Sequence, residues 1–131
     1  MARTLTTAIQ KRFSDIDSFQ HVNNVSQQMY FDVGKMDYYD QILGAEVLLG
    51  RLRIITVATS NSYIRQIHFT DTPRVTTTCE KIGTKSMNLV QRILCGEEVC
   101  SESRSVMVAF DFEAQEALPV PAEWCERMLR D

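Results

Sequence analysis

The spacing of apolar residues along the chain changes from one period to another, and each period predicts a different kind of element. Alternation of apolar and polar residues is typical of half-buried strands, whereas apolar residues three or four positions apart indicate a helix. Turn residues precede each of the last three alternating segments, which predicts antiparallel neighbours there. The five expected strands are Thr6 to Phe13, Arg53 to Phe69, Arg74 to Ile82, Ser86 to Cys95 and Val99 to Phe112.

The helical spacing runs from about Val25 to Leu43. Its apolar residues form a stripe that is widened by aromatic rings, so we expect burial on several sides, as in a helix wrapped by a curved sheet. The stripe consists of Met29, Val33, Met36 and Leu43, widened by Tyr30, Phe31 and Tyr39. The residues expected near solvent are Asp32, Lys35, Asp37 and Asp40, and Gly44 is the expected stop.

The ends of the helices and the order of the elements complete the predicted fold. Asn24 followed by Gln27 resembles a capping box, which places the start of the long helix at the asparagine pair. A short terminal helix is expected over Pro119 to Leu129. One strand, one long helix and four strands predict an α+β fold, with a curved antiparallel five-stranded sheet around the helix. We expect a single domain over residues 1–131, and self-association through an uncovered sheet edge or face.

Composition narrows the classes of partner and compartment. The net charge is -3 and the basic residues are scattered, so a nucleic-acid partner is not expected. No apolar run is long enough for a membrane span, and a cytoplasmic protein without membrane partners is expected. The four cysteines, which include no C-x-x-C pair, are expected to be reduced and mostly buried: Cys79, Cys95, Cys100 and Cys125. An alternative is that Cys95 and Cys100 face each other across a hairpin and bridge under oxidation.

A dozen residues ahead of the long helix concentrate carboxylates, an imidazole and amides. A turn needs only one or two such residues, and backbone N–H groups point outward at a helix start. This segment is therefore interpreted as an active-site loop. Its candidate residues are Asp15, Asp17, His21, Asn23 and Asn24.

The motif Asp15-Ile16-Asp17 followed by His21-Val22-Asn23-Asn24 and a helix resembles the hotdog-fold acyl-CoA thioesterases of the 4-hydroxybenzoyl-CoA thioesterase-like family. The order of strand, loop, central helix and four strands resembles that family over essentially the whole chain. The acidic turn at residues 70–75 and the pair Asp32 and Lys35 add to the likeness. Gln27 departs from it, because relatives usually carry an aromatic residue there, and this affects the shape of the acyl pocket.

The resemblance implies thioester hydrolysis with Asp17 as the catalytic carboxylate, acting as nucleophile or as general base. It also implies backbone amides at the first helical turn as donors to the thioester oxygen, for which we expect those of Val22 and Asn23. Negative charge develops on that oxygen during hydrolysis, and preorganised N–H groups stabilise it. The alternative for Asp17 is that it only braces the loop by accepting backbone hydrogen bonds.

The other site residues have different expected roles. His21 is a candidate to polarise the thioester or orient water, Asn24 is expected to cap the helix and so aim the oxyanion donors, and Asn23 is free to contact ligand. Asp15 is expected to be structural. The candidates for substrate binding are Asn61, Tyr63 and Tyr30, the first two through a partner subunit's pocket as in relatives.

The implied ligand is an acyl-CoA or acyl-carrier-protein thioester, handled by a homodimer or homotetramer without a cofactor or metal. Basic side chains available for the phosphates of coenzyme A are Arg65, Arg74, Lys81, Lys85 and Arg92. Two alternatives stay open: a module that binds acyl thioesters without cleaving them, and a hotdog dehydratase that uses His21 with Asp17. A polar pocket floor at Gln27 would favour short or hydroxylated acyl groups, and an apolar tunnel closed by Met29 and Tyr30 would favour longer ones.

Overall fold

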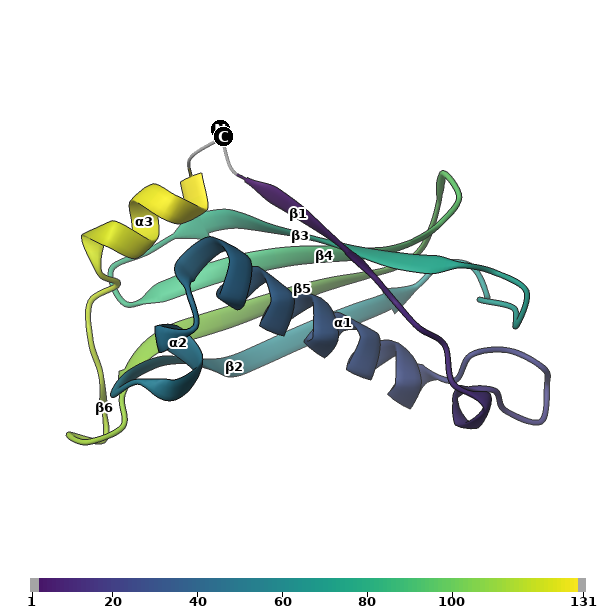
Figure 1. The fold of residues 1–131 in the computed structure, drawn as a ribbon, viewed down its shortest axis with the longest axis horizontal. Coiled ribbons are helices and arrows are strands. Elements are labelled where there is room, and N and C mark those ends of the chain that lie inside the picture. The colour runs from purple at the N-terminus through teal and green to yellow at the C-terminus, as the bar shows by residue number, and fades with distance from the viewer. Residues whose placement is uncertain (1–2, 130–131) are drawn as a thin grey trace.

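The computed structural model describes residues 3–129 (Figure 1). The sheet consists of β1 (Thr4–Ala8), β2 (Leu52–Tyr63), β3 (Pro73–Ile82), β4 (Ser86–Cys95), β5 (Glu98–Asp111) and the short β6 (Glu116–Ala117). The helices are α1 (Asn24–Tyr38), α2 (Glu46–Leu49) and α3 (Ala122–Leu129), with a 3-10 turn at Phe13–Asp15 and a π-helical turn at Tyr39–Leu43. None of the helices in this part of the chain is long and apolar enough to cross a membrane.

The predicted α+β architecture is confirmed. The strands follow the order β1, β3, β4, β5, β2, every neighbouring pair is antiparallel, and β6 adds a short pairing to β5. Helix α1 lies along one face of this sheet, and the loop before α1 and helix α3 lie at opposite ends of the molecule (Figure 1). The strands around a long central helix define the hotdog fold that the sequence predicts.

Two strand ends differ from the prediction. The first strand ends at Ala8, because the chain turns into the 3-10 segment in which Phe13 is almost fully exposed. Strand β2 ends at Tyr63, because the amides of Ile64 and Arg65 both donate to the Cys100 carbonyl and leave the regular ladder. The segment between Tyr63 and β3 is thereby free to fold back toward the loop before α1.

The buried face of α1 is only in part the one that the apolar stripe predicts: Tyr30, Phe31, Tyr39 and Leu43 are buried as expected. Met29, Val33 and Met36 are about half exposed, whereas Lys35 is buried. The helix contacts the sheet at Gly34, where an added Cβ would lie 2.6 Å from Val75 Cγ1. Close approach at this glycine fixes which side chains face inward, and hydrophobicity alone does not.

The core is divided into two apolar clusters along α1. One cluster, near α3, includes Tyr38, Leu43 and Trp124. The other cluster, near the start of α1, includes Phe31, Ile67 and Ile93. The predicted terminal helix is confirmed as α3, and the stop at Gly44 is also confirmed, since its φ of 96° suits glycine. The cysteines are free, and all but Cys125 are buried.

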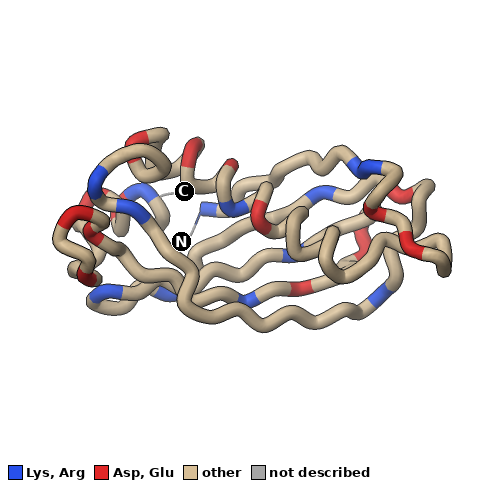
Figure 2. The backbone as a smooth tube through the Cα atoms, turned by 90° about the horizontal axis from the view of Figure 1, so that it is seen from below, with Lys and Arg blue, Asp and Glu red and all other residues tan. Residues whose placement is uncertain are grey.

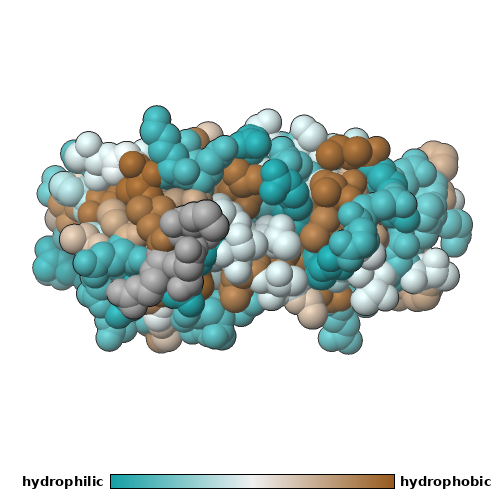
Figure 3. Space-filling view, turned by 90° about the horizontal axis from the view of Figure 1, so that it is seen from above, coloured by the Kyte–Doolittle hydropathy of each residue, from teal (hydrophilic) through white to brown (hydrophobic). Residues whose placement is uncertain are grey.

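The remaining apolar surface is broken into patches. Seen from above, exposed apolar side chains alternate with polar ones (Figure 3). Along α1 the exposed apolar residues are Val25, Met29, Val33 and Met36. Met29 and Val33 among them line a hollow beside Ala8 and Ile9, at the end of β1.

Candidate active site

Asp15 holds the loop before α1 in place. Its carboxylate is fully buried and accepts hydrogen bonds from the Arg12 amide at 2.8 Å, the Arg12 guanidinium at 2.9 Å and the Tyr30 hydroxyl at 2.6 Å. Burial alone would raise the pKa of Asp15, but the bonds from Tyr30 and Arg12 outweigh burial and hold the pKa below its ordinary value. Asp15 is a structural residue of the loop, in line with the sequence prediction.

The two asparagines exchange the roles that the sequence suggests. Asn23 is the N-cap of α1, because its Oδ1 accepts from the Ser26 amide at 2.8 Å. Its Nδ2 also donates to the Asp15 carbonyl at 3.0 Å. The prediction that Asn24 caps the helix is wrong: the helix already begins at Asn24, one residue earlier than a cap there would require, and Asn24 is exposed in the first turn.

The two amides that the sequence predicts as oxyanion donors, those of Val22 and Asn23, are already hydrogen-bonded within the protein. The Val22 amide donates to the Ile67 carbonyl at 2.8 Å, and the Asn23 amide donates to the Asp15 carbonyl at 2.9 Å. Both are therefore occupied, and the prediction for them is wrong. Within residues 3–129, the amides of Asn24 and Val25 make no hydrogen bond, as is normal for the first turn of a helix.

A pocket of about 390 Å³ opens at this end of α1. Asp17, His21 and Asn24 line one part of it, and Tyr63 from the end of β2 lines another. One carboxylate oxygen of Asp17 accepts from the amides of Phe19 at 2.9 Å and His21 at 3.3 Å. Within the described residues its other oxygen accepts no hydrogen bond and is available to a ligand.

The floor of the pocket is polar. Gln27 is buried, donates from Nε2 to the Val22 carbonyl at 3.3 Å, and accepts at Oε1 from the Ser101 hydroxyl. Met29 is exposed on another face of α1 and lines a separate hollow together with Tyr30. Of the two pocket shapes considered from the sequence, the structure has the polar floor.

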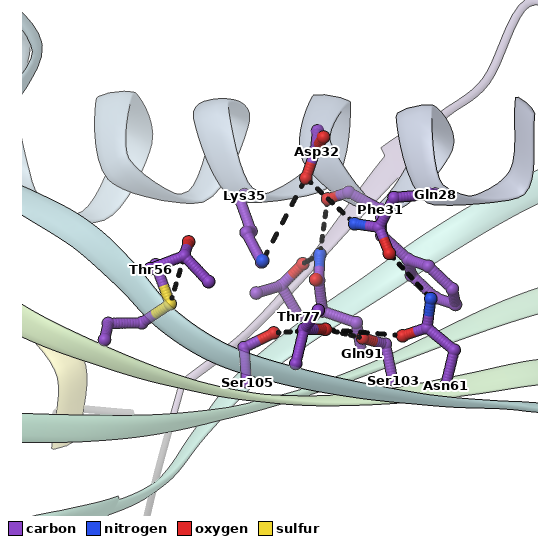
Figure 4. Close-up of polar contacts among 12 residues, drawn as sticks. Gln28, Phe31, Asp32, Lys35, Thr56, Asn61, Thr77, Gln91, Ser103 and Ser105 are labelled. Atoms are coloured by element: carbon purple, nitrogen blue, oxygen red, sulfur yellow. Dashed lines mark hydrogen bonds and ion pairs between the residues drawn. The ribbon is translucent and has the colours of Figure 1, made fainter. Parts of the chain in front are cut away.

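The candidate substrate-binding residues lie in three different situations. Tyr63 lines the pocket beside Asp17 of the same chain. Asn61 donates to Gln28 Oε1 at 2.6 Å, which joins β2 to α1 next to the pocket, and Figure 4 shows the two side chains turned toward each other. Tyr30 points elsewhere, because its buried ring belongs to the core and its hydroxyl is bound to Asp15.

His68 is a neighbour of the pocket that sequence reasoning missed. Its ring packs edge-on against that of His21 with centroids 5.1 Å apart, and the two residues form an isolated antiparallel bridge. The Asp71 carboxylate accepts from the His68 amide at 2.9 Å and from Arg65 at 3.2 Å. The acidic turn that includes Asp71 was the one available signal, but it did not show that the segment after β2 returns to the loop.

Few of the candidate phosphate ligands lie near this pocket. Basic and acidic positions are interspersed along the chain (Figure 2). Arg65 lines the pocket, and its guanidinium pairs with Asp71 and with Glu98 at 2.8 Å. Lys81 near the end of β3 and Lys85 in the turn before β4 lie toward the other end of the molecule.

A larger hollow of about 600 Å³ lies at that other end, beside α2 and α3. Its lining includes Arg51, Trp124 and Arg127, but none of the candidate catalytic or substrate-binding residues. Arg127 is already engaged there, since it donates to the Leu43 carbonyl at 2.6 Å and pairs with Glu123. The smaller pocket at the start of α1 is therefore the candidate active site.

Comparison with known proteins agrees with this fold. A family model described as the thioesterase-like superfamily matches residues 12–128, so the chain belongs to that superfamily. The class of enzyme is thus a thioester hydrolase, as the sequence predicts. No curated protein sequence gives a significant match.

Several solved structures share the fold over nearly the full length. A predicted thioesterase from Bacillus stearothermophilus is 25% identical with a TM-score of 0.87, covering 96% of this chain and 94% of its own. A Thermus thermophilus thioesterase complexed with coenzyme A and Zn is 21% identical with a TM-score of 0.83, covering 94% and 90%. Slr0204, a 1,4-dihydroxy-2-naphthoyl-CoA thioesterase from Synechocystis, is 15% identical with a TM-score of 0.82, covering 96% of each.

Proposed function

We propose that the protein hydrolyses an acyl-CoA thioester to a carboxylic acid and free coenzyme A in the pocket at the start of α1. One observation carries the proposal: Asp17, whose carboxylate has an oxygen without a hydrogen bond from the described residues, lines the same pocket as Asn24. Within residues 3–129, the amides of Asn24 and Val25 make no hydrogen bond and are the free donors at the start of α1. A carboxylate and preorganised N–H donors are what thioester hydrolysis requires.

The chemistry has two routes that use the same residues. In one, an Asp17 oxygen bonds to the carbonyl carbon, the carbon–sulfur bond breaks, and coenzyme A leaves as a thiolate that takes up a proton; water then cleaves the anhydride. In the other, Asp17 removes a proton from water as that water attacks the carbonyl carbon; the carbon–sulfur bond then breaks, and coenzyme A leaves as a thiolate that takes up this proton. In both, the thioester oxygen gains negative charge, which the amides of Asn24 and Val25 stabilise. His21 lines the same pocket and serves to orient the water or the thioester. Neither route uses a cofactor.

Coenzyme A is the preferred carrier in this proposal. Two structures with the same fold are described as complexes with coenzyme A, one from Thermus thermophilus and one from Staphylococcus aureus. The basic side chain closest to the pocket is that of Arg65, which lines its rim and would have to exchange an existing carboxylate partner for a phosphate.

We also propose that the protein acts as a homo-oligomer that pairs through β2. This strand lies at one edge of the sheet, is twelve residues long, and is exposed over most of its second half. A long unpaired edge offers its backbone groups to a second copy. Pairing there would place Asn61 and Tyr63 of one subunit next to the second subunit.

The test is release of free thiol from a panel of short, long and aromatic acyl-CoA esters by the native protein and by Asp17→Asn. The carboxamide in this variant would keep an oxygen for the two loop amides, so the loop should persist while the carboxylate is lost. We expect the rate to fall by about 10²–10⁴-fold. Asp40→Asn, an exposed change beyond α1, is the matched control and should leave the rate unchanged.

Two results would contradict the proposal. The first is hydrolysis that is equally fast in Asp17→Asn, which would reduce Asp17 to bracing the loop. The second is tight binding of acyl-CoA by the native protein with no thiol released across the panel. That second result would favour the module that binds thioesters without cleaving them.

A further inference from the structure

A band of polar side chains crosses the middle of the sheet underneath α1. Thr77 of β3, Gln91 of β4, and Ser103 and Ser105 of β5 are almost completely buried there. The band separates the two apolar clusters of the core, and Figure 4 shows it between α1 and the strands. Burying polar groups at the centre of a domain is unfavourable unless they find partners, so this band calls for an explanation.

Helix α1 contributes a matching polar stripe. Asn24, Gln28, Asp32 and Lys35 are spaced by four, four and three residues, which places them on one face of the helix. Gln28 donates to Asp32 Oδ1 at 3.1 Å and accepts from Asn61 of β2 at 2.6 Å. The stripe therefore starts at the candidate active site and continues along the side of α1 that faces β2.

Lys35 is the charged end of this stripe. Its side chain is 6% exposed and points from α1 toward the sheet (Figure 4). The nearest carboxylate oxygen is Asp32 Oδ1 at 4.0 Å, on a side chain that is 59% exposed. Among the described residues the ammonium has no hydrogen bond, and burial lowers the pKa of Lys35 more than Asp32 raises it. A buried cation with such weak compensation is unfavourable without a further anionic partner.

The polar band has a second unsatisfied atom and an exposed neighbour on β2. Gln91 donates from Nε2 to the Phe31 carbonyl at 2.8 Å and to Thr77 at 3.1 Å, but its buried Oε1 has no partner among the described residues. On β2, Thr59 has its hydroxyl 3.4 Å from that of Ser103, and this threonine is exposed. The polar band thus reaches the exposed part of β2.

We propose that the acyl part of the substrate lies along this polar side of α1 and carries a carboxylate at its far end, which pairs with Lys35. This inference rests on the proposed function, and it names the substrate class as mono-thioesters of dicarboxylic acids. An apolar acyl chain would gain nothing here, because the exposed apolar residues Met29, Val33 and Met36 lie on another face of α1. It would also leave the Lys35 ammonium buried and unpaired.

The helix sets the length of the acyl group. The Lys35 ammonium lies beside Asp32, so the position of Asp32 along the helix axis also gives that of the ammonium. Asp32 follows Asn24 by eight residues, and eight residues span about 12 Å along a helix. Hydrogen bonds of about 3 Å at each end leave about 6 Å for the acyl group. An extended chain advances about 1.2 Å per bond, since three backbone bonds span about 3.3–3.6 Å. About five bonds fit, which corresponds to about six carbons.

The test compares hexanoyl-CoA, 6-hydroxyhexanoyl-CoA and adipoyl-CoA, which differ only at the far end of a six-carbon acyl group. For the native protein we expect kcat/KM to be at least about tenfold higher for adipoyl-CoA than for hexanoyl-CoA, with the hydroxylated ester between them. Lys35→Met keeps an unbranched side chain without the charge and should reduce the ratio of adipoyl-CoA to hexanoyl-CoA to about one. Lys81→Met, an exposed change on β3, should leave the ratio as in the native protein.

Each outcome decides one of the two claims. If the native protein hydrolyses hexanoyl-CoA as well as adipoyl-CoA, or if the preference survives in Lys35→Met, the inference is wrong and the proposed function stands. If no ester is hydrolysed, the proposed function fails, and calorimetric binding of the same esters decides the inference by the same ratio. If Lys35→Met does not fold, the native protein still decides: succinyl-CoA must be a poorer substrate than adipoyl-CoA by at least about tenfold.

Discussion

Two aspartates separated by one residue have different surroundings, and these surroundings decide what each can do. Asp15 is fully buried and saturated with donors, whereas Asp17 keeps an oxygen that is free of hydrogen bonds from the described residues at the pocket. The sequence predicted this division, because carboxylates two positions apart on an extended segment need not share a role. It could not predict the donors, which come from Arg12 and from Tyr30 further along α1.

The state of Asp15 predicts how stability depends on pH. Its pKa is lowered in the folded protein, so its contribution is complete above the ordinary value of about 3.9 and is lost as the pH falls through the lowered native value. Tyr30→Phe removes one donor and should raise the native pKa of Asp15 toward that ordinary value. We expect a loss of about 1.5–3 kcal/mol in unfolding free energy at pH 7 and a shallower decline below about pH 4.

Urea unfolding between pH 7 and pH 3 measures this effect. Tyr63→Phe is the control, since the Tyr63 side chain is 45% exposed and its hydroxyl only reaches Asn61 at 3.5 Å. Equal stability of Tyr30→Phe and the native protein at pH 7, with parallel curves on acidification, would contradict the role given to Asp15.

At the scale of elements, the start of α1 is set by Asn23. Asn23→Ala removes the oxygen that caps the Ser26 amide and the bond to the Asp15 carbonyl, and it should cost about 1–2 kcal/mol of unfolding free energy. Asn24→Ala changes an exposed residue in the first turn and should be within about 0.5 kcal/mol of the native protein. Chemical denaturation of the two variants side by side checks this. A larger loss of unfolding free energy in Asn24→Ala than in Asn23→Ala would show that Asn24 is the cap.

The helices and strands were largely predictable from the spacing of apolar residues and from the turn residues. The face that α1 buries was not. The order of strands and helices follows from alternation and helical spacing. The inward face of α1 was predicted only in part. Tyr30 and Phe31 are buried as expected, but the outer face is also apolar and the inner face carries Lys35 and Gln27. The deciding contact is the approach of Gly34 to Val75, which joins residues 41 positions apart and leaves no mark in local periodicity.

The return of the chain after β2 was unpredictable for a similar reason. Ile67 accepts from the Val22 amide, and His68 packs on His21, although 45 or more residues separate the partners in each pair. The sequence therefore identified the loop that bears Asp17 and His21, but not the second wall of the pocket. It also assigned oxyanion donation to amides that are already bound, one of them by this returning segment.

At the scale of the whole molecule, the uncovered β2 edge predicts association. Sedimentation equilibrium should give a mass of at least twice the 15.0 kDa of one chain. Val57 is at the middle of β2 and exposed, so two copies paired antiparallel would meet there. Val57→Asp should weaken association by placing like charges opposite each other. A native protein that stays monomeric at micromolar concentration would contradict this prediction.

The central claim is that thioester hydrolysis takes place at the first turn of α1, with free backbone amides as oxyanion donors. Asn24→Pro removes one of these amides, and the first helical position tolerates proline. The preceding residue also suits it, since Asn23 has ψ near 164°. Asn24→Ala removes the same side chain and keeps the amide.

The decisive measurement is therefore kcat for thiol release from the best acyl-CoA substrate in these two variants. We predict that Asn24→Pro is slower than Asn24→Ala by about 10²–10³-fold. Equal rates in two folded variants would contradict the placement of the reaction at the start of α1.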